Sequence, residues 1–185
     1  MAAQRTRILN ATLRCISKLG IERASVTEIR REAGLSAGAL YLHFANKDEI
    51  IIEALRSASV RETHLPETWP EFVAAIASMA DEDAFDMPTI ARSQLQVFAL
   101  AIRPGPMRNL LAPLIADALD FVVQHLAAMQ VAGQVKLRLS PRRTALAIGA
   151  LKDGLVWSGL ALDRPRHEIE ADIVAATQCF VSAAD

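Results

Sequence analysis

The sequence predicts an all-α protein in which a small N-terminal domain of three helices is followed by a larger helical domain. Hydrophobic residues make up 52% of the 185 residues, enough to fill a substantial core. Eight glycines and eight prolines are few for a turn-rich β-sandwich. Apolar residues recur at spacings of three and four, and no alternation of useful length indicates a strand.

Four helices are predicted within residues 6–58, the three of the N-terminal domain and a fourth that connects it to the larger domain, because capping residues recur there at the spacing that helix ends require. A serine or asparagine followed three positions later by glutamate forms a capping box at a helix start. A glycine after the last apolar residue ends a helix. The start signals are Ser25 with Glu28, Ser36, and Asn46 with Glu49, and the stop signals are Gly20 and Gly34.

The composition changes near residue 64, and prolines mark most of the later helix starts. We therefore expect domains at residues 1–64 and 65–185. Thr68 with Glu71 can cap a helix to about residue 80, and an acidic loop follows at 81–86. Further helices are predicted from Pro88 to the turn at 103–106, over 107–132 with a kink or break at Pro113, from Ser140 to about 162, and after the turn at 163–165 through Phe180.

Charge and cysteine content narrow the partners and the compartment. Residues 1–64 carry ten basic and seven acidic side chains, whereas residues 65–185 carry ten and fourteen. The basic end is where a polyanion would bind, although a solvated helix face can carry the same excess. Two distant cysteines and no apolar run of about 18 residues lead us to expect a soluble, cytoplasmic protein that does not enter a membrane.

Residues 25–44 have the pattern of a helix-turn-helix. A short helix ends in the turn Gly34-Leu35-Ser36, and a second short helix follows. In this motif the first helix braces the second, which enters the major groove of DNA. On this pattern alone, an ordinary helical hairpin inside an all-α core fits equally well.

The segment SVTEIRREAGLSAGALYLHFANKDEIIIEAL closely resembles the DNA-binding signature of the TetR family of bacterial transcriptional regulators. The resemblance covers residues 5–56. It implies that residues 66–185, which match only in architecture, form a helical domain that binds a small molecule and dimerises. The matching residues are Ile29, Ala33-Gly34-Leu35-Ser36, Gly38, Leu40-Tyr41, His43-Phe44 and Asn46-Lys47.

The resemblance also implies a function. Such a protein is a ligand-responsive transcriptional regulator, usually a repressor, that binds a palindromic double-stranded DNA operator as a homodimer and is released by a small, largely apolar effector. A helical adaptor that binds proteins and not DNA is the alternative.

The four histidines lack metal-ligand spacing, and no glycine-rich phosphate loop or nucleophile–base pair is present. We therefore expect no catalytic activity, cofactor or metal.

DNA-contacting roles carry over to residues in and around the motif. Tyr41 and His43 match groove and phosphate contacts, and Lys47 lies at a helix N-terminus, which favours a phosphate. A solvated Lys47, a packed Tyr41 and a half-buried His43 are the alternative interpretations. The full predicted set is Thr27, Arg30, Ser36, Ala37, Gly38, Ala39, Tyr41, His43 and Lys47.

Two positions depart from the family pattern. Arg30 stands where a small alanine is usual, so its side chain must turn outward or loosen the helix packing. The run Ala37-Gly38-Ala39 lacks hydrogen-bonding side chains where base-reading groups could lie. Base discrimination would then rest on thymine methyl groups, on Thr27 and on DNA shape.

Small residues line one face of each of the last two predicted helices, and small side chains let another helix approach closely. The resemblance implies that both helices pair with their copies in a second subunit. Packing of both faces within one subunit is the alternative. The predicted interface residues are Ala147, Ala150, Gly154, Ser158, Ala161, Ala171, Ala175, Cys179 and Ser182.

Isolated polar groups on apolar helix faces are candidates for a ligand pocket in the larger domain. Gln94, His125 and Asp153 fit this description, and neighbouring aromatic residues extend the set. For each residue alone, a satisfied core or interface position is the more common role. The candidates are Trp69, Gln94, Phe98, Phe121, His125, Asp153 and Trp157.

Overall fold

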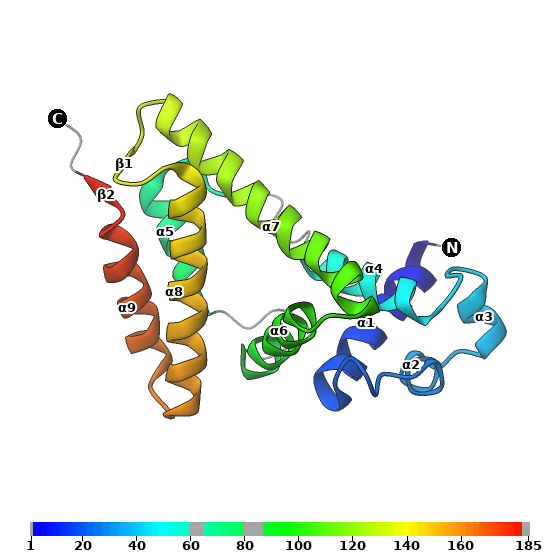
Figure 1. The fold of residues 1–185 in the computed structure, drawn as a ribbon. Coiled ribbons are helices and arrows are strands. Elements are labelled where there is room, and N and C mark those ends of the chain that lie inside the picture. Colours follow the sequence, from blue (N-terminus) through cyan, green and yellow to red (C-terminus); the bar gives the residue numbers. More distant parts are fainter. Residues whose placement is uncertain (1, 60–64, 80–86, 183–185) are drawn as a thin grey trace. The chain divides into compact units, whose positions relative to one another are not determined.

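The computed structural model describes residues 2–59, 65–79 and 87–182, which form a chain of helices (Figure 1). The predicted all-α fold is confirmed, and the acidic segment 81–86 lies outside the described residues. The helices are α1 (Ala2–Leu19), α2 (Val26–Ala33), α3 (Ala37–Tyr41), α4 (Lys47–Ser59), α5 (Trp69–Ala77), α6 (Met87–Ile102), α7 (Pro106–Val131), α8 (Pro141–Ala161) and α9 (Arg166–Gln178). Two short strands, β1 (Lys136–Leu137) and β2 (Val181–Ser182), pair antiparallel.

The chain divides into two compact units. The first unit comprises Met1–Thr63 and Asp81–Leu114, and the second comprises His64–Ala80 and Ile115–Asp185. The boundary expected at residue 64 assigned α6 to the larger domain, whereas here α6 and the start of α7 group with the first four helices. The physical reason is that Val97, Leu100 and Met107 pack against the core of the first unit.

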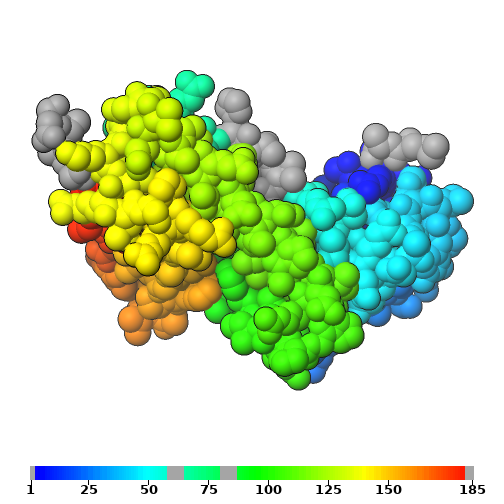
Figure 2. All heavy atoms as spheres, turned by 45° about the horizontal axis from the view of Figure 1, so that its top comes forward, coloured from blue at the N-terminus to red at the C-terminus, as the bar shows by residue number. Residues whose placement is uncertain are grey.

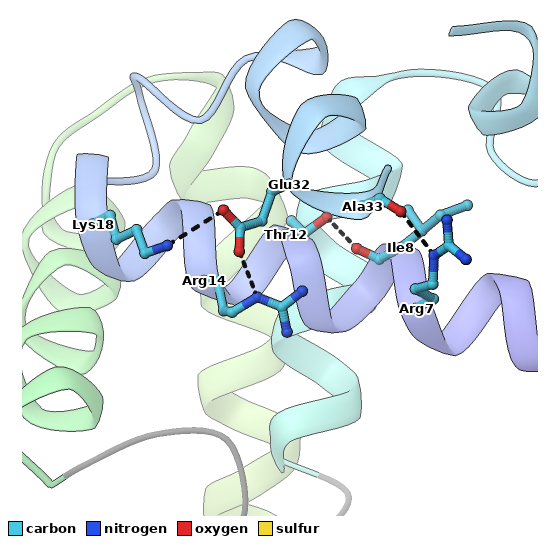
Figure 3. A network of polar contacts seen from close by, with 7 residues as sticks. All are labelled: Arg7, Ile8, Thr12, Arg14, Lys18, Glu32 and Ala33. Carbon is cyan, nitrogen blue, oxygen red and sulfur yellow. Dashed lines mark hydrogen bonds and ion pairs between the residues drawn. The ribbon is translucent and has the colours of Figure 1, made fainter. Parts of the chain in front are cut away.

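Side chains from α1 to α4 form the core of the first unit. Each helix contributes a fully buried aliphatic residue, namely Ile8, Ile29, Leu40 and Ile50. The buried hydroxyl of Thr12 donates to the Ile8 carbonyl oxygen at 2.8 Å, so this polar group is satisfied within α1 (Figure 3). The apolar stripes predicted from the sequence therefore meet in one core.

The predicted helix starts in the first unit are confirmed by their hydrogen bonds. The Ser25 hydroxyl accepts from the Glu28 N–H at 3.2 Å, and the Asn46 side-chain oxygen accepts from the Glu49 N–H at 2.9 Å. The Glu49 carboxylate reaches back to the Ala45 N–H, one residue before the position that a capping box predicts. These bonds satisfy backbone groups that a helix end leaves without partners.

The second unit contains α5, α8, α9 and most of α7. Helix α9 packs against both α5 and α8. Where α8 packs on α9, a Cβ atom added to Gly159 would lie 2.4 Å from Cδ1 of Ile169, so a larger residue there would have to displace the Ile169 side chain. Ile169 and Ile173 of α9 are fully buried, and Ile169 lies against Gly159.

Three details of the later helices differ from the sequence predictions. The Thr68 hydroxyl bonds the Glu71 carboxylate at 2.7 Å and does not cap the backbone of α5. Helix α7 continues through Pro113 without a break. The last helix ends at Gln178, because residues 181–182 leave the helical conformation to pair with β1.

Within the described ranges, α7 is long and apolar enough to cross a membrane by length and composition alone, with a mean hydropathy of 1.5 over its most apolar window. One such helix is weak evidence, because core helices of soluble proteins meet the same criterion.

Candidate nucleic-acid interface

An arginine of α1 binds the turn between α2 and α3. The Arg7 guanidinium donates to the Ala33 carbonyl oxygen at 2.7 Å (Figure 3). It also donates to the Gly34 carbonyl oxygen at 2.9 Å. Gly34 adopts the left-handed conformation, with φ of +61°, which costs other residues about 1 kcal/mol. The predicted helix-turn-helix is therefore present, and Arg7 ties its turn to α1.

A second polar contact clamps α2 against α1. The Glu32 carboxylate accepts from Arg14 Nε at 2.7 Å and from Lys18 Nζ at 3.3 Å (Figure 3). The hydrogen bond from Arg14 is the main reason that the pKa of the Glu32 carboxyl lies below its ordinary value, and Lys18 adds to the effect against the opposing influence of burial. Both sets of contacts fix the C-terminal end of the bracing helix to α1, since Glu32 lies in the last turn of α2 and Arg7 binds the turn that follows it.

Helix α3 presents its outer side to solvent. Leu40 is fully buried, whereas Ala37 and Gly38 are exposed and Tyr41 is 52% exposed. The packed-aromatic interpretation of Tyr41 is therefore wrong. Ser36 caps the helix by accepting from the Ala39 N–H at 3.2 Å. Figure 2 shows the blue-to-cyan atoms of this part of the chain uncovered at the surface of the first unit.

The predicted contacts on α2 also lie at the surface. Thr27, in the first turn of α2, and Arg30, further along it, are both exposed. Arg30 therefore takes the outward arrangement and does not enter the packing between the helices. Among the described residues it forms no ion pair, whereas its neighbour Arg31 pairs with Glu28.

Lys47 and His43 are both engaged within the chain. Lys47 begins α4, and its Nζ donates to the Glu22 carbonyl oxygen at 3.2 Å, which leaves two of its three protons for another acceptor. His43 is half-buried, and its Nε2 lies 3.3 Å from the Gln4 side-chain oxygen. The half-buried interpretation of His43 is thus confirmed, while a DNA contact remains a prediction for both residues.

The sequence singled out Gln94 on α6, but the structure shows a role for Gln96. Gln94 is exposed, whereas the Gln96 side-chain oxygen accepts from the Ile21 N–H at 3.2 Å. The one sequence signal for this contact was Gly20, which predicts the end of α1. Its φ of +87° ends the helix, so the N–H of the next residue needs an acceptor from elsewhere. The acceptor lies far along the chain, so local sequence could not identify it. Arg7 escaped notice for the same reason.

Two of the predicted ligand residues come together in the second unit. The rings of Trp69 and His125 each stack with the Phe72 ring, with centroid distances of 5.6 Å and 5.5 Å. Trp69 Nε1 donates to Gln178 at 3.1 Å, and His125 Nε2 lies 2.8 Å from the Pro66 carbonyl oxygen. Both polar groups are therefore satisfied within the fold.

The other candidate ligand residues lie on three helices. Phe121 is 37% exposed on α7, and Asp153 and Trp157 are half-buried on α8. Gln94 and Phe98 lie on α6 and belong to the first unit. The structure therefore gathers Trp69 and His125 around Phe72 and distributes the remaining candidates.

The predicted dimer residues of α8 and α9 form exposed faces. Ala147 is half-buried, and Ser182 lies in β2. Packing between α8 and α9 within the chain uses Gly159 and Ile169 instead. The exposed members are Ala150, Gly154, Ser158, Ala161, Ala171, Ala175 and Cys179.

A braced helix-turn-helix with an exposed second helix, followed by further helices, defines a DNA-binding regulator of transcription. Residues 8–54 match the family model described as bacterial regulatory proteins, tetR family. The chain belongs to the TetR family of transcriptional regulators.

Known proteins resemble the chain both in sequence and in fold. The transcriptional regulator TtgR of Pseudomonas putida is 27% identical over 182 residues, covering 86% of this chain and 82% of its own length. PksA of Bacillus subtilis is 40% identical over 60 residues, or 32% of this chain and 29% of its own length. Escherichia coli NemR in its reduced form has the same fold, with a TM-score of 0.75, 14% identity and 98% coverage of each chain. A TetR-family regulator structure from Rhodococcus sp. gives a TM-score of 0.78 at 21% identity, covering 98% of this chain and all of that one.

Proposed function

We propose that this regulator is a repressor that binds a palindromic operator as a homodimer and leaves it when a small, largely apolar effector binds. The proposal that the chain binds DNA rests on the exposed outer side of α3. The buried Leu40 packs the opposite side of this helix into the core of the first unit. Its exposed residues suit a major groove, because α3 carries no acidic side chain that would repel the phosphates on either side of the groove.

Phosphate contacts would come from groups beside α3. Lys47 has two free protons at the N-terminus of α4, where the helix dipole also favours an anion. Thr27 lies in the first turn of α2, and Arg30 is an exposed cation without an ion-pair partner in the described part of the chain. Tyr41 adds a hydroxyl donor from the recognition helix.

The experiment that tests DNA binding is selection of bound sequences from a random double-stranded DNA pool. We expect an inverted repeat, whose affinity falls as salt concentration rises because phosphate contacts release counterions. Enrichment of no sequence, together with no salt-dependent shift of DNA, would instead support a protein-binding adaptor.

The exposed small faces of α8 and α9 support the homodimer. Gly154 has no heavy atom within 4 Å of the position its Cβ would take, so a side chain there meets only what lies outside the chain. We expect Gly154→Arg to give a monomer in sedimentation velocity, because the charge would lie in the seam between subunits. Ala74→Arg, an exposed position on α5, is the matched control and should leave the dimer intact.

The effector site is proposed for the second unit, around the aromatic group of Trp69, Phe72 and His125. Proteins of this fold were crystallised with choline, from Saccharomonospora viridis, and with stearoyl-CoA, in FadR from Bacillus subtilis. Their TM-scores to this chain are 0.71 and 0.68. The apolar surroundings of the aromatic group, which include Leu126 and Met129, favour a largely apolar ligand here.

Release requires that the effector bind the DNA-incompetent arrangement more tightly. A tenfold loss of operator affinity needs about 1.4 kcal/mol of coupling. Thermal-shift screening of a metabolite and drug library, followed by operator titration with each compound that stabilises the protein, tests this step. Compounds that stabilise the protein and leave operator affinity unchanged would contradict it.

A further inference from the structure

The outer side of the recognition helix contains a leucine that the family resemblance did not mark. Leu42 follows α3 directly and keeps the helical geometry, since its N–H donates to the Gly38 carbonyl oxygen at 3.2 Å. It therefore lies one turn beyond Gly38 on the same side of the helix, next to Tyr41. Its side chain is 83% exposed, whereas Leu40 and Phe44 on the other side are buried.

Gly38 is the second observation, because nothing within the chain requires a glycine there. Its φ lies outside the left-handed region, and an added Cβ would meet no heavy atom within 4 Å. Glycine in a helix is less favourable than alanine, so the position lowers helix stability with no benefit to packing. A missing side chain beside an exposed leucine lets a partner approach the helix backbone closely.

The chemistry of the major groove identifies what an apolar side chain can contact. Base edges there present hydrogen-bond donors and acceptors, together with one apolar group, the C5 methyl of thymine. Ala37, Gly38 and Leu42 carry no hydrogen-bonding side chain, so they cannot read the polar pattern. On the proposed DNA-binding function, we infer that Leu42 reads a thymine methyl group in each operator half-site and that Gly38 allows the close approach this contact needs.

The test removes the methyl group and the leucine separately. The operator is first selected with the natural protein from a random DNA pool. Each half-site thymine is then replaced symmetrically by deoxyuridine, which lacks only the methyl group, and affinities are measured by fluorescence anisotropy. Burial of one methyl group corresponds to about fourfold in affinity, so replacement in both half-sites should weaken binding by about fifteenfold at the contacted position.

The same substitutions are then measured with Leu42→Ala. We expect the deoxyuridine effect at that position to fall below about twofold, with an unchanged salt slope because no phosphate contact is lost. Leu19→Ala, which removes another exposed leucine of the first unit, should keep the full effect. An equal deoxyuridine effect with and without Leu42, or no sensitive thymine at all, would overturn the inference.

Gly38→Ala tests the close approach. Because the added methyl group meets nothing in the chain, the melting temperature should stay the same or rise, while operator affinity should fall at least about tenfold from steric exclusion at the base edges. Natural affinity in Gly38→Ala would overturn the second part of the inference. A random pool that yields no binding sequence would contradict the proposed function itself, which distinguishes the two failures.

Discussion

The side-chain oxygen of Gln96 in α6 accepts a hydrogen bond from the Ile21 backbone N–H at 3.2 Å. This bond joins a helix from the middle of the sequence to the loop between α1 and α2, within the first unit. The loop also contains Glu22, whose carbonyl oxygen accepts from Lys47. Residues 21 and 22 therefore connect α6 to the proposed phosphate-binding start of α4 through adjacent backbone groups.

Gln96→Ala should lower the free energy of unfolding by about 1 kcal/mol, because the backbone N–H of the buried Ile21 loses its acceptor. Urea denaturation measures the change, and hydrogen exchange at the Ile21 amide should become faster. Gln94→Ala is the matched control on the same helix. Since Gln94 is exposed, its loss should change stability by less than about 0.5 kcal/mol. Equal effects of the two substitutions would contradict the role of Gln96.

Lys47→Ala should weaken binding about equally on all DNA sequences and reduce the salt slope by about one unit, because it removes one phosphate contact. Tyr41→Phe should act in the same direction but more weakly. Operator titration over a range of salt concentrations measures both. Lys152→Ala, on α8, is the control and should leave the slope unchanged. A change in base preference at an intact salt slope would show that Lys47 does not bind phosphate.

Glu32→Gln should reveal a pH-dependent contribution to stability. Arg14 and Lys18 lower the pKa of the Glu32 carboxyl in the folded chain, so ionised Glu32 stabilises the fold. The stability that ionised Glu32 adds is fully present well above the ordinary carboxyl pKa of 4.5. It is lost as the pH falls below 4.5 and passes through the lower pKa that Glu32 has in the folded chain. Because the pair is partly exposed, the loss at pH 7 should be at most about 1 kcal/mol.

The measurement is urea unfolding of the natural protein and Glu32→Gln between pH 7 and pH 3.5. The difference between the two proteins should shrink toward the acidic end. Glu67→Gln, at an exposed position, serves as the control and should show no such trend. A difference that grows on acidification has the wrong sign for this ion pair.

Gly159→Ala should lower the free energy of unfolding by about 1–3 kcal/mol, since the new methyl group would overlap the Ile169 side chain. Gly149→Ala, on the same helix, meets nothing within 4 Å and should be neutral or stabilising by up to about 1 kcal/mol. Thermal or urea denaturation compares the two. Similar losses for both would mean that α8 and α9 do not pack through Gly159.

Local signals predicted most of the first unit. The caps at Ser25, Ser36 and Asn46 and the turn at Gly34 depend on neighbouring residues, so a short stretch of sequence contains all the atoms involved. The contact between Gln96 and Ile21 joins residues 75 positions apart, and no local pattern encodes it. The grouping of α6 with the first unit escaped prediction for the same physical reason.

The site was predictable in part. The residues of α3 were identified from the family signature, but Leu42 lies at a position where the signature does not specify a residue, and only its 83% exposure draws attention to it. In the second unit, isolated polar residues on apolar faces were a weak guide. His125 and Trp69 proved to be satisfied within the fold, which a one-dimensional pattern cannot distinguish from ligand contact.

The measurement that tests the central claim most directly compares the selected operator with a version in which about five base pairs are inserted between its half-sites. One turn of DNA holds about 10 base pairs, so the insertion places the two half-sites on opposite faces of the duplex. If a symmetric dimer reads both half-sites, sedimentation of the natural operator should show two chains per duplex, and the insertion should reduce affinity by at least about a hundredfold. Unchanged affinity after the insertion, or one chain per duplex at saturation, would contradict recognition of a palindrome by a dimer.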